Sequence, residues 1–417
     1  MKRRDFLGGA VLAGALGGSL CVAVGNSAWA AVSDLRATAA SSKLVVVFLR
    51  GAVDGLSVVV PYAEAAYYRA RETIAIPPPG ADGGGLDLDG RFALHPSLAA
   101  LMPHWQSGRL AFVHAAGSTD PTRSHFDAQD YMESGTPGRK STADGWINRL
   151  IGVLPGGGTA LSVGAVMPRA LAGVQPVAVL PSGRGAMRAS PLDRPRIGAA
   201  FDQLYGGNDK LGDAYRESRQ SHKDMMATLG TENLAAEMQA ASNGAAPASV
   251  FTSDAGRLAR LMRGDPRIRI AFLAVGGWDT HANQGASSGQ LANRLQALGH
   301  GLTGLAQGLG PDLDDTVIVV MSEFGRTVRQ NGNGGTDHGH GNVMWLLGGP
   351  VAGGKVHGRW PGLDNSALHE GRDLAVTTDF REVLAHVAAR HLRVNDQQMA
   401  RLFPDFKADG QGSLLRS

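Results

Sequence analysis

Polar side chains follow several short apolar runs of the sequence, and their residue types suit metal and anion chemistry. Asp54 follows the first run, Asp279 and His281 follow a later one, and Glu323 and Arg326 follow the last. Carboxylates and imidazoles are the protein ligands that divalent metal ions take where no thiolate is present. Each group alone is more typical of an ordinary loop, but several groups at equivalent positions predict one shared polar site.

A further group lies at the start of a predicted helix. Ser124 follows Arg123 there, and Asp127 comes three residues after the serine, a spacing close to that of a capping box. Ser124 is therefore either an N-cap or a nucleophile, placed where the positive potential of a helix start also attracts an anionic substrate. In the second case Arg123 or Arg326 would contact phosphate or sulfate oxygens, whereas a surface salt bridge is the ordinary role of an arginine.

A glycine-rich loop after residue 330 adds three more donors, Asp337, His338 and His340. Glycines beside donor side chains let the backbone approach an ion closely. A divalent metal ion is therefore expected, with Zn²⁺, Mn²⁺, Mg²⁺ and Ca²⁺ all open as its identity. Its predicted ligands are Asp54, Asp279, His281, Glu323, Asp337, His338 and His340.

The apolar runs alternate with helical patterns, which predicts an α/β fold: a doubly wound, mostly parallel sheet sandwiched by helices. Runs such as KLVVVFL are apolar throughout and rich in β-branched residues, as in strands buried on both faces. In such a fold, ligands bind beyond the carboxyl ends of the strands, which is where the polar groups lie. We expect strands at 43–49, 110–115, 268–275, 316–322 and 344–347, and helices at 64–71, 96–106, 289–309 and 379–390, with one more from about residue 124.

The start of the chain has the pattern of a twin-arginine signal peptide. A pair of arginines precedes a Gly/Ala-rich apolar stretch, and Ala28-Trp29-Ala30 is a small-x-small cleavage site. We expect the twin-arginine export machinery to be a partner and residues 1–30 to be removed, with a retained helix as the alternative. The mature chain would then be periplasmic or secreted, without a membrane anchor. We expect it to form one domain over residues 31–417, with a helical insertion at about 197–262.

The composition excludes several classes of protein. Of the 417 residues, 43% are hydrophobic, which is enough for a sizeable core and too many for a disordered chain. The one cysteine, Cys21, lies in the predicted signal, so the mature chain has no disulfide, thiolate metal site or catalytic thiol. The signal also carries two of the three net positive charges, so charge gives no reason to expect nucleic acid as a partner.

The blocks that carry these residues resemble those of the exported "domain of unknown function 1501" family. They are VVVFLRGAVDGLSVVVPY, HAAGSTDPTRSHFDAQDYMESG, GGWDTHANQG and VIVVMSEFGRTVRQNGNGGTDHGHG, in order from about residue 43 to 350. That family is grouped with the sulfatases and alkaline phosphatases. The resemblance implies an alkaline-phosphatase-like fold with metal-binding carboxylates and histidines at strand ends, and with a Ser, Thr or modified Cys at a helix start.

By position, Asp54 resembles the carboxylate after the first strand of that fold, and Ser124 resembles the nucleophile. Asp279 and His281 resemble one metal pair, Glu323 the carboxylate after the later strand, and His338 or His340 the late histidine. The sequence departs from the pattern at Glu323-Phe324, where a well-formed member has Asp-His, and at Asp279-x-His281, where the spacing is Asp-x-x-x-His.

The sulfatase signature is absent around Ser124, which disfavours arylsulfatase chemistry. The resemblance still implies an exported, metal-dependent hydrolase of phosphate or sulfate esters, acting on a small anionic ester. The alternative is a non-catalytic exported protein that uses the same fold for binding or assembly, which the departures from the ligand pattern favour.

Overall fold

The computed structural model describes residues 21–22, 42–140, 142–183, 240–409 and 413–416. The predicted signal at 1–30 lies outside the described residues except for Cys21 and Val22, so export and cleavage stay predictions. The predicted insertion lies outside them up to residue 239. Within the described part of the chain, no helix is both long enough and apolar enough to cross a membrane.

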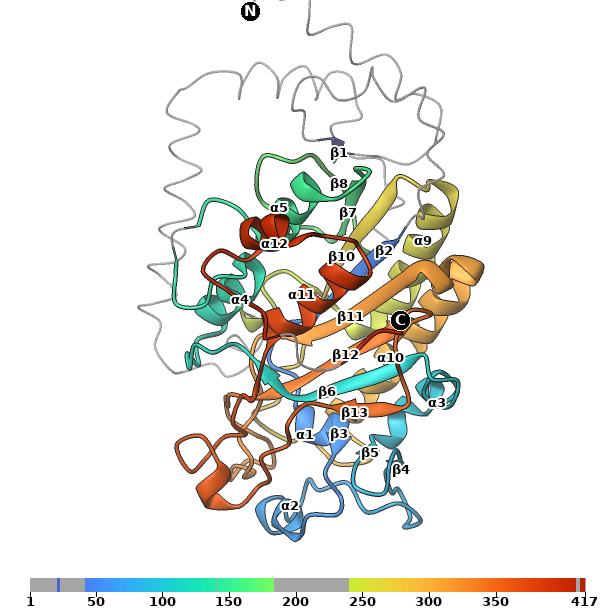
Figure 1. The fold of residues 1–417 in the computed structure, drawn as a ribbon. Helices are drawn as coiled ribbons and strands as arrows, with labels where there is room; N and C mark the ends of the chain where they lie inside the picture. Colours follow the sequence, from blue (N-terminus) through green and yellow to red (C-terminus); the bar gives the residue numbers. More distant parts are fainter. Residues whose placement is uncertain (1–20, 23–41, 141, 184–239, 410–412, 417) are drawn as a thin grey trace, which may run out of the picture.

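A large sheet forms the centre of the molecule (Figure 1). Its strands are β1 (Cys21–Val22), β2 (Lys43–Leu49), β6 (Leu110–Gly117), β7 (Thr159–Val163), β8 (Val177–Leu180), β9 (Ala246–Pro247), β10 (Ile268–Gly276), β11 (Thr316–Ser322), β12 (Asn342–Gly348), β13 (Lys355–His357) and β14 (Thr378–Asp379). The order across the sheet is β1-β8-β7-β10-β2-β11-β12-β6-β13, with β9 beside β10 and β14 beside β6. A small second sheet contains β3 (Val59–Val60), β5 (Ala93–Leu94) and β4 (Leu86–Asp87).

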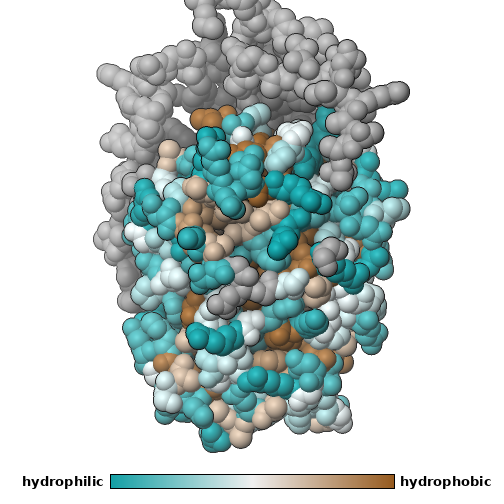
Figure 2. Space-filling view, in the orientation of Figure 1, coloured by the Kyte–Doolittle hydropathy of each residue, from teal (hydrophilic) through white to brown (hydrophobic). Residues whose placement is uncertain are grey.

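Helices cover both faces of the main sheet, which confirms the predicted α/β class (Figure 1). One face carries α9 (Ala248–Gly264) and α10 (Gln290–Leu309), and the other carries α4 (His125–Ser134), α5 (Trp146–Val153), α11 (Phe380–Arg390) and α12 (Asp396–Leu402). Short helices α1 (Gly55–Val58), α2 (Ala65–Ala70) and α3 (Met102–Gln106) lie in the connections. Figure 2 shows a mostly hydrophilic outer face, on which hydrophobic side chains form small scattered groups.

Strand β2 is central, and its side chains alternate between two hydrophobic cores. Val45 and Val47 pack in the core that includes residues of α9 and α10, whereas Val46 and Phe48 pack in the core that includes α5, α11 and α12. All seven residues of β2 are buried, because neighbouring strands and both helix layers cover them. This explains why the run is apolar throughout instead of alternating.

The observed elements differ from the predicted ones in a few places. Strands β2 and β11 have the predicted bounds, while β10 and β6 run on to Gly276 and Gly117. The helix predicted at 96–106 begins as a 3₁₀ turn, Pro96–Leu101, and is α-helical only from Met102. Pro103 lacks the N–H that would bond to the fourth residue before it, which explains the tighter first turn. Helix α9, which falls largely within the predicted insertion at 197–262, packs along α10 in the helix layer.

The strand directions bring the predicted polar groups to one edge. Strand β2 is parallel to β10 and β11, and β12 is antiparallel to both β11 and β6. The carboxyl ends of β2, β6, β10 and β11 therefore lie at the same edge of the sheet, the one formed by the strand ends, and β12 begins there. The loop that precedes β12 must start and finish at that edge, and it carries the glycine-rich His and Asp segment.

Candidate metal centre

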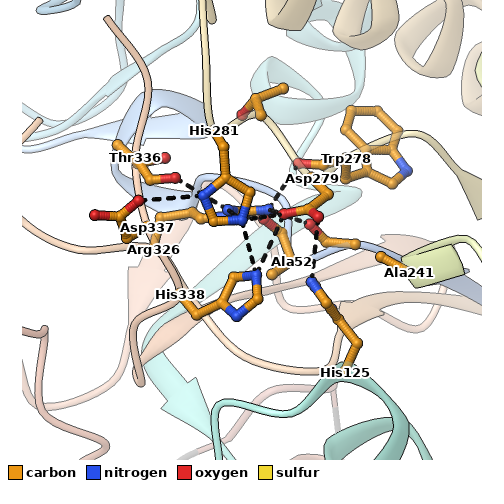
Figure 3. A network of polar contacts seen from close by, with 12 residues as sticks. Ala52, His125, Ala241, Trp278, Asp279, His281, Arg326, Thr336, Asp337 and His338 are labelled. Carbon is orange, nitrogen blue, oxygen red and sulfur yellow. Dashed lines mark hydrogen bonds and ion pairs between the residues drawn. The ribbon is translucent and has the colours of Figure 1, made fainter. Parts of the chain in front are cut away.

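One strand end, one helix and one loop bring imidazoles and a carboxylate together at this edge (Figure 3). Asp279 and His281 follow β10, His125 is the first residue of α4, and His338 lies in the loop between β11 and β12. These segments are far apart in the sequence and meet only because their strands end at the same edge. The site is thus a product of the sheet topology.

The side chains of this metal cluster, which we define as His125, Asp279, His281 and His338, are close enough to share one ion. His125, Asp279 and His338 each offer one ligand atom, and these atoms all lie within 4.8 Å of one another. The Nε2 of His281 lies 3.0 Å from Asp279 Oδ1 and 2.9 Å from the Nε2 of His338. The Asp279 side chain is almost fully buried at 1% exposure, whereas His281 and His338 are 15% and 17% exposed, so the cluster opens to solvent on their side.

Each imidazole of the metal cluster has its Nδ1 against an oxygen. The Nδ1 atoms of His125, His281 and His338 lie 2.8 Å from Glu323 Oε1, 3.2 Å from Asp337 Oδ1 and 2.8 Å from the Arg123 carbonyl oxygen, respectively. Carbonyl and carboxylate oxygens accept hydrogen bonds, so each Nδ1 carries the donated proton. The three Nε2 atoms all face Asp279, which is the side from which histidines bind metals. Burial would lower the pKa of His125, but interactions with Asp279 and Glu323 outweigh it and raise the pKa to about 9, so a bound metal ion would displace a proton from this ring.

Two polar atoms in the cluster are buried without a hydrogen-bond partner among the described residues. They are His125 Nε2 and Asp279 Oδ2, which lie 3.5 Å apart. Leaving a buried donor or acceptor unpaired costs about 1–3 kcal/mol, so such atoms need an explanation. A cation between them would satisfy both, and the donors of the cluster therefore fit a divalent metal ion.

Two glycines allow the backbone segments of the site to approach each other. Gly51, in the turn after β2 and with φ 111°, lies so close to Asp279 that a Cβ would be 2.7 Å from the Asp279 backbone nitrogen. Gly339 follows His338, and a Cβ there would lie 2.4 Å from the carbonyl carbon of Arg326. Side chains at either position would push these segments apart.

Glu323 was expected to be a metal ligand, but the structure does not bring it into the cluster. Its Oε1 accepts hydrogen bonds from His125 Nδ1, from Gln129 Nε2 at 3.0 Å and from the Gly51 N–H at 2.8 Å. Burial alone would raise the pKa of Glu323, but the hydrogen bond and charge of His125 outweigh it and lower the pKa to about 2. The carboxylate is therefore ionised, and it orients His125.

Arg326 was expected to contact a substrate, but its guanidinium is buried and bonded to the protein. It donates to the carbonyl oxygens of Ala52 at 2.7 Å, Gly51 at 2.6 Å and Thr336 at 3.1 Å, and it pairs with Asp279 Oδ1. These bonds engage all three of its nitrogens. Arg326 therefore holds Asp279 in place, and each of its nitrogens has a protein partner.

Asp54 was expected to be a ligand as well, and it lies outside the metal cluster. It forms a buried two-pronged ion pair with Arg71, at 2.5 and 2.9 Å, and accepts further hydrogen bonds from Ser57 at 2.7 Å and Gln284 at 2.8 Å. Burial favours the protonated acid, but Arg71 more than offsets this and lowers the pKa of Asp54. The sequence spacing could not reveal this partner.

Ser124 and Arg123 lie at the rim of the cluster. Ser124 is exposed and caps α4, accepting a hydrogen bond from the Asp127 N–H at 3.4 Å. The residues on either side of it serve the cluster, since the Arg123 carbonyl holds His338 and His125 belongs to the cluster. The Arg123 guanidinium points to Glu370 at 2.6 Å and Asp373 at 2.8 Å, as in an ordinary salt bridge.

The remaining expected ligands differ in their positions. Asp337 is 53% exposed and accepts hydrogen bonds from His281 Nδ1 and from Asn331 Nδ2 at 3.0 Å, so it orients that histidine. His340 is buried against the ring of His369, with 4.5 Å between the ring centroids, and lies outside the cluster. Burial lowers the pKa of His340 to about 4.

Sequence reasoning missed two residues of this site. His125 stands next to Ser124 in a recognised polar group, and only its place at the first turn of α4 turns the ring toward Asp279. Burial lowers the pKa of Arg294 in α10 while the charge of Asp279 opposes this, and the buried Nη1 of Arg294 has no hydrogen-bond partner among the described residues. No pattern in the sequence marks Arg294, because its neighbours on the helix are unremarkable.

Similar solved structures have low sequence identity to this chain. Ps i-CgsB in complex with k-i-k-neocarrahexaose is 12% identical, with a TM-score of 0.38 over 86% of this chain and 73% of that one. An alkaline phosphatase superfamily protein from Vibrio parahaemolyticus is 13% identical, with a TM-score of 0.34 over 76% and 62% of the two chains. The C-terminal periplasmic domain of EcEptC from Escherichia coli, in complex with Zn, is 11% identical, with a TM-score of 0.34 over 74% and 72%.

The sequence itself gives a firmer assignment. No curated protein sequence shows significant similarity to the chain. One family model, described as a protein of unknown function (DUF1501), matches residues 41–403, which is most of the chain and contains every residue of the metal cluster. The chain belongs to the DUF1501 family.

Proposed function

We propose that this protein is an exported metal-dependent hydrolase of phosphate or sulfate esters. The observation that carries the proposal is the metal cluster, in which three Nε2 atoms converge on one buried carboxylate while each Nδ1 is held by an oxygen. Structural histidines in a protein interior use both ring nitrogens in hydrogen bonds. In the cluster, the second nitrogen of all three rings faces the same carboxylate, and two of these nitrogens also face each other.

The donor set favours a transition metal over magnesium or calcium. Three imidazoles and one carboxylate suit Zn²⁺ or Mn²⁺, whereas Mg²⁺ and Ca²⁺ take mostly oxygen ligands. His125, His281, His338 and Asp279 would hold the ion. When bound, a divalent ion supplies Lewis acidity that polarises an ester oxygen and neutralises developing negative charge.

The residues at the rim would then act on the ester itself. Ser124 is the exposed hydroxyl between Arg123 and His125, at the positive end of a ten-residue helix. We assign it to attack the ester or to orient a water that does so. The N–H groups at the start of α4 favour the negative charge of the transferred group.

The proposal includes export through the twin-arginine route. The signal pattern at 1–30 supports it, and that route carries proteins that have already folded. The metal cluster is assembled from residues 125 to 338, so it forms only when the whole sheet has folded. Metal loading in the cytoplasm, before export, would follow. The mature chain would lack a membrane anchor and have no nucleic-acid partner.

One observation favours the alternative of a non-catalytic exported binding protein. Arg326 already places a positive charge on Asp279 Oδ1, as a bound ion would. A cluster of this kind could survive without metal if the fold served only to present a binding surface. With Arg326 in place, Asp279 Oδ2 and His125 Nε2 still have no hydrogen-bond partner among the described residues and face each other at 3.5 Å, which is why we favour the hydrolase.

A screen of phosphate and sulfate monoesters tests the proposal. The mature protein would be assayed as purified, after chelation, and after chelation followed by Zn²⁺ or Mn²⁺. The hydrolase predicts turnover that is lost on chelation, restored by one of the ions and abolished in His281→Gln. Metal that binds with no turnover of any ester would overturn the hydrolase in favour of the binding protein.

A further inference from the structure

A basic pocket lies beside the metal cluster. It has a volume of about 350 Å³, between α2 and the chain segments that follow Arg326 and precede Asp373. Three arginines, Arg69, Arg329 and Arg372, line it against a single carboxylate, and one asparagine, one glycine and several alanine, valine and leucine residues complete the walls. We call it the arginine pocket.

Two of these arginines lack partners among the described residues. Arg69 and Arg329 are exposed, and neither guanidinium has a hydrogen bond or ion pair in this part of the chain. Arg372 donates to the His338 carbonyl oxygen at 2.6 Å and to Asp373. Like charges gathered in one concave site repel each other and focus a positive potential, which an anion would relieve.

The backbone fixes the arginine pocket next to the metal cluster. Arg372 lines the pocket, and its guanidinium contacts the carbonyl of His338, which is a residue of the cluster. The Val328 N–H bonds to the Arg372 carbonyl at 3.2 Å, and the Gln330 N–H bonds to the Ala70 carbonyl at 2.9 Å. These bonds tie both walls together, so the distance between pocket and cluster is set by the fold.

We propose that the arginine pocket binds a second anionic group of the substrate, carried on the same molecule as the ester that the metal cluster acts on. Sulfate, phosphate and carboxylate groups all fit, because the fork of a guanidinium matches their paired oxygens. The substrate class is then an ester with at least two anionic groups. That the bound anion belongs to an ester substrate rests on the proposed function, whereas the existence of the anion site does not.

Titration calorimetry with inorganic sulfate tests the anion site independently of catalysis. The chelator-treated protein would be compared with Arg329→Gln, Arg69→Gln and Arg401→Gln, the last an exposed arginine of α12 outside the pocket that serves as a control of equal charge change. We expect each pocket variant to weaken sulfate binding about tenfold, and the control to leave it unchanged. Equal sulfate affinity in all four proteins, or no binding at millimolar sulfate, would overturn the anion site.

Steady-state kinetics then separate a substrate group from a free anion. Two esters would be compared, one with a second sulfate on the same small molecule and one without it. We expect Arg329→Gln to raise the KM of the doubly charged ester about tenfold more than that of the singly charged one. Equal effects on the two esters would show that the pocket takes a free anion, and would overturn the substrate assignment. If no ester is hydrolysed, the proposed function fails while the sulfate titration still decides the anion site.

Discussion

The Nε2 atoms of His281 and His338 lie 2.9 Å apart, and both face the same oxygen of Asp279. Because each Nδ1 faces an oxygen acceptor, the two Nε2 lone pairs meet where a proton or a cation must separate them. Burial lowers the pKa of His338, which favours the neutral ring that a metal requires. This relationship is the basis on which we propose a metal centre here, and it distinguishes the cluster from an ordinary buried salt bridge.

Replacement of Glu323 tests whether it acts through His125. Glu323→Gln removes the charge that orients the His125 ring, and such partners of a metal-binding histidine are worth about 10- to 100-fold in metal affinity. We expect a loss of that size, measured by competition with a chromophoric chelator. Glu72→Gln, an exposed acid outside the site, is the control. Unchanged affinity in Glu323→Gln would contradict the role of His125 as a ligand.

Replacement of Asp54 separates structure from metal binding. Asp54→Asn leaves Arg71 buried without its counter-charge, which costs about 3–5 kcal/mol in the free energy of unfolding. We expect urea denaturation to show that loss, while elemental analysis of the folded protein shows unchanged metal content. If the variant does not fold, Asp54→Asn with Arg71→Met removes both charges and should restore folding. Metal lost from either folded variant would contradict our assignment.

Replacement of Ser124 separates the cap from the hydroxyl. Asparagine is as good an N-cap as serine but has no nucleophilic oxygen, so Ser124→Asn should keep the thermal midpoint. Ser124→Ala should lose the cap as well, at about 1 kcal/mol of stability. We expect both variants to lose ester turnover. Full turnover in Ser124→Asn would show that the hydroxyl only caps the helix.

Acid should destabilise the protein through two buried histidines outside the metal cluster. His95 and His114 use both ring nitrogens as neutral rings, and burial lowers the pKa of each from 6.5 to about 4. The unfolded chain therefore binds more protons between pH 6.5 and 4. Stability from each ring is complete above pH 6.5 and falls by about 3 kcal/mol as the pH drops to 4.

Urea denaturation at pH 7, 5.5 and 4.5 measures this loss. His114→Gln should lower the stability at pH 7 and give a shallower fall toward acid, because one of the buried titrating rings is gone. An identical fall in the variant and the parent protein would mean that His114 does not set the acid limit.

The sequence was sufficient for the layers of the fold and for the edge where the polar groups meet. Runs such as Lys43–Leu49 are apolar enough to be recognised as doubly buried strands, and strand direction follows from their alternation with helices. The pairing of side chains within the site was not predictable. Asp54 pairs with Arg71 across 17 residues and Arg326 pairs with Asp279 across 47, through loop conformations that spacing does not encode.

His125 is a second example of a contact that the sequence could not predict. Its ring joins the cluster because His125 is the first residue of α4, directly after the Ser124 cap, and because Glu323 holds its Nδ1. The sequence marks the cap clearly, but it does not say which of the next side chains turns inward. A departure from the family pattern, such as Glu323 before Phe324, indicates that a residue has a different role, but it does not say which role.

Metal content tests the central claim most directly. The mature protein would be exported natively, purified without a histidine tag and measured by elemental mass spectrometry beside the His338→Gln variant. The His338 side chain is partly exposed, so replacing it should cost less stability than replacing the buried Asp279. Our account predicts about one equivalent of Zn or Mn in the parent protein and a large loss in the variant. A parent protein that holds no metal, and takes up neither Zn²⁺ nor Mn²⁺ when they are added, would contradict it.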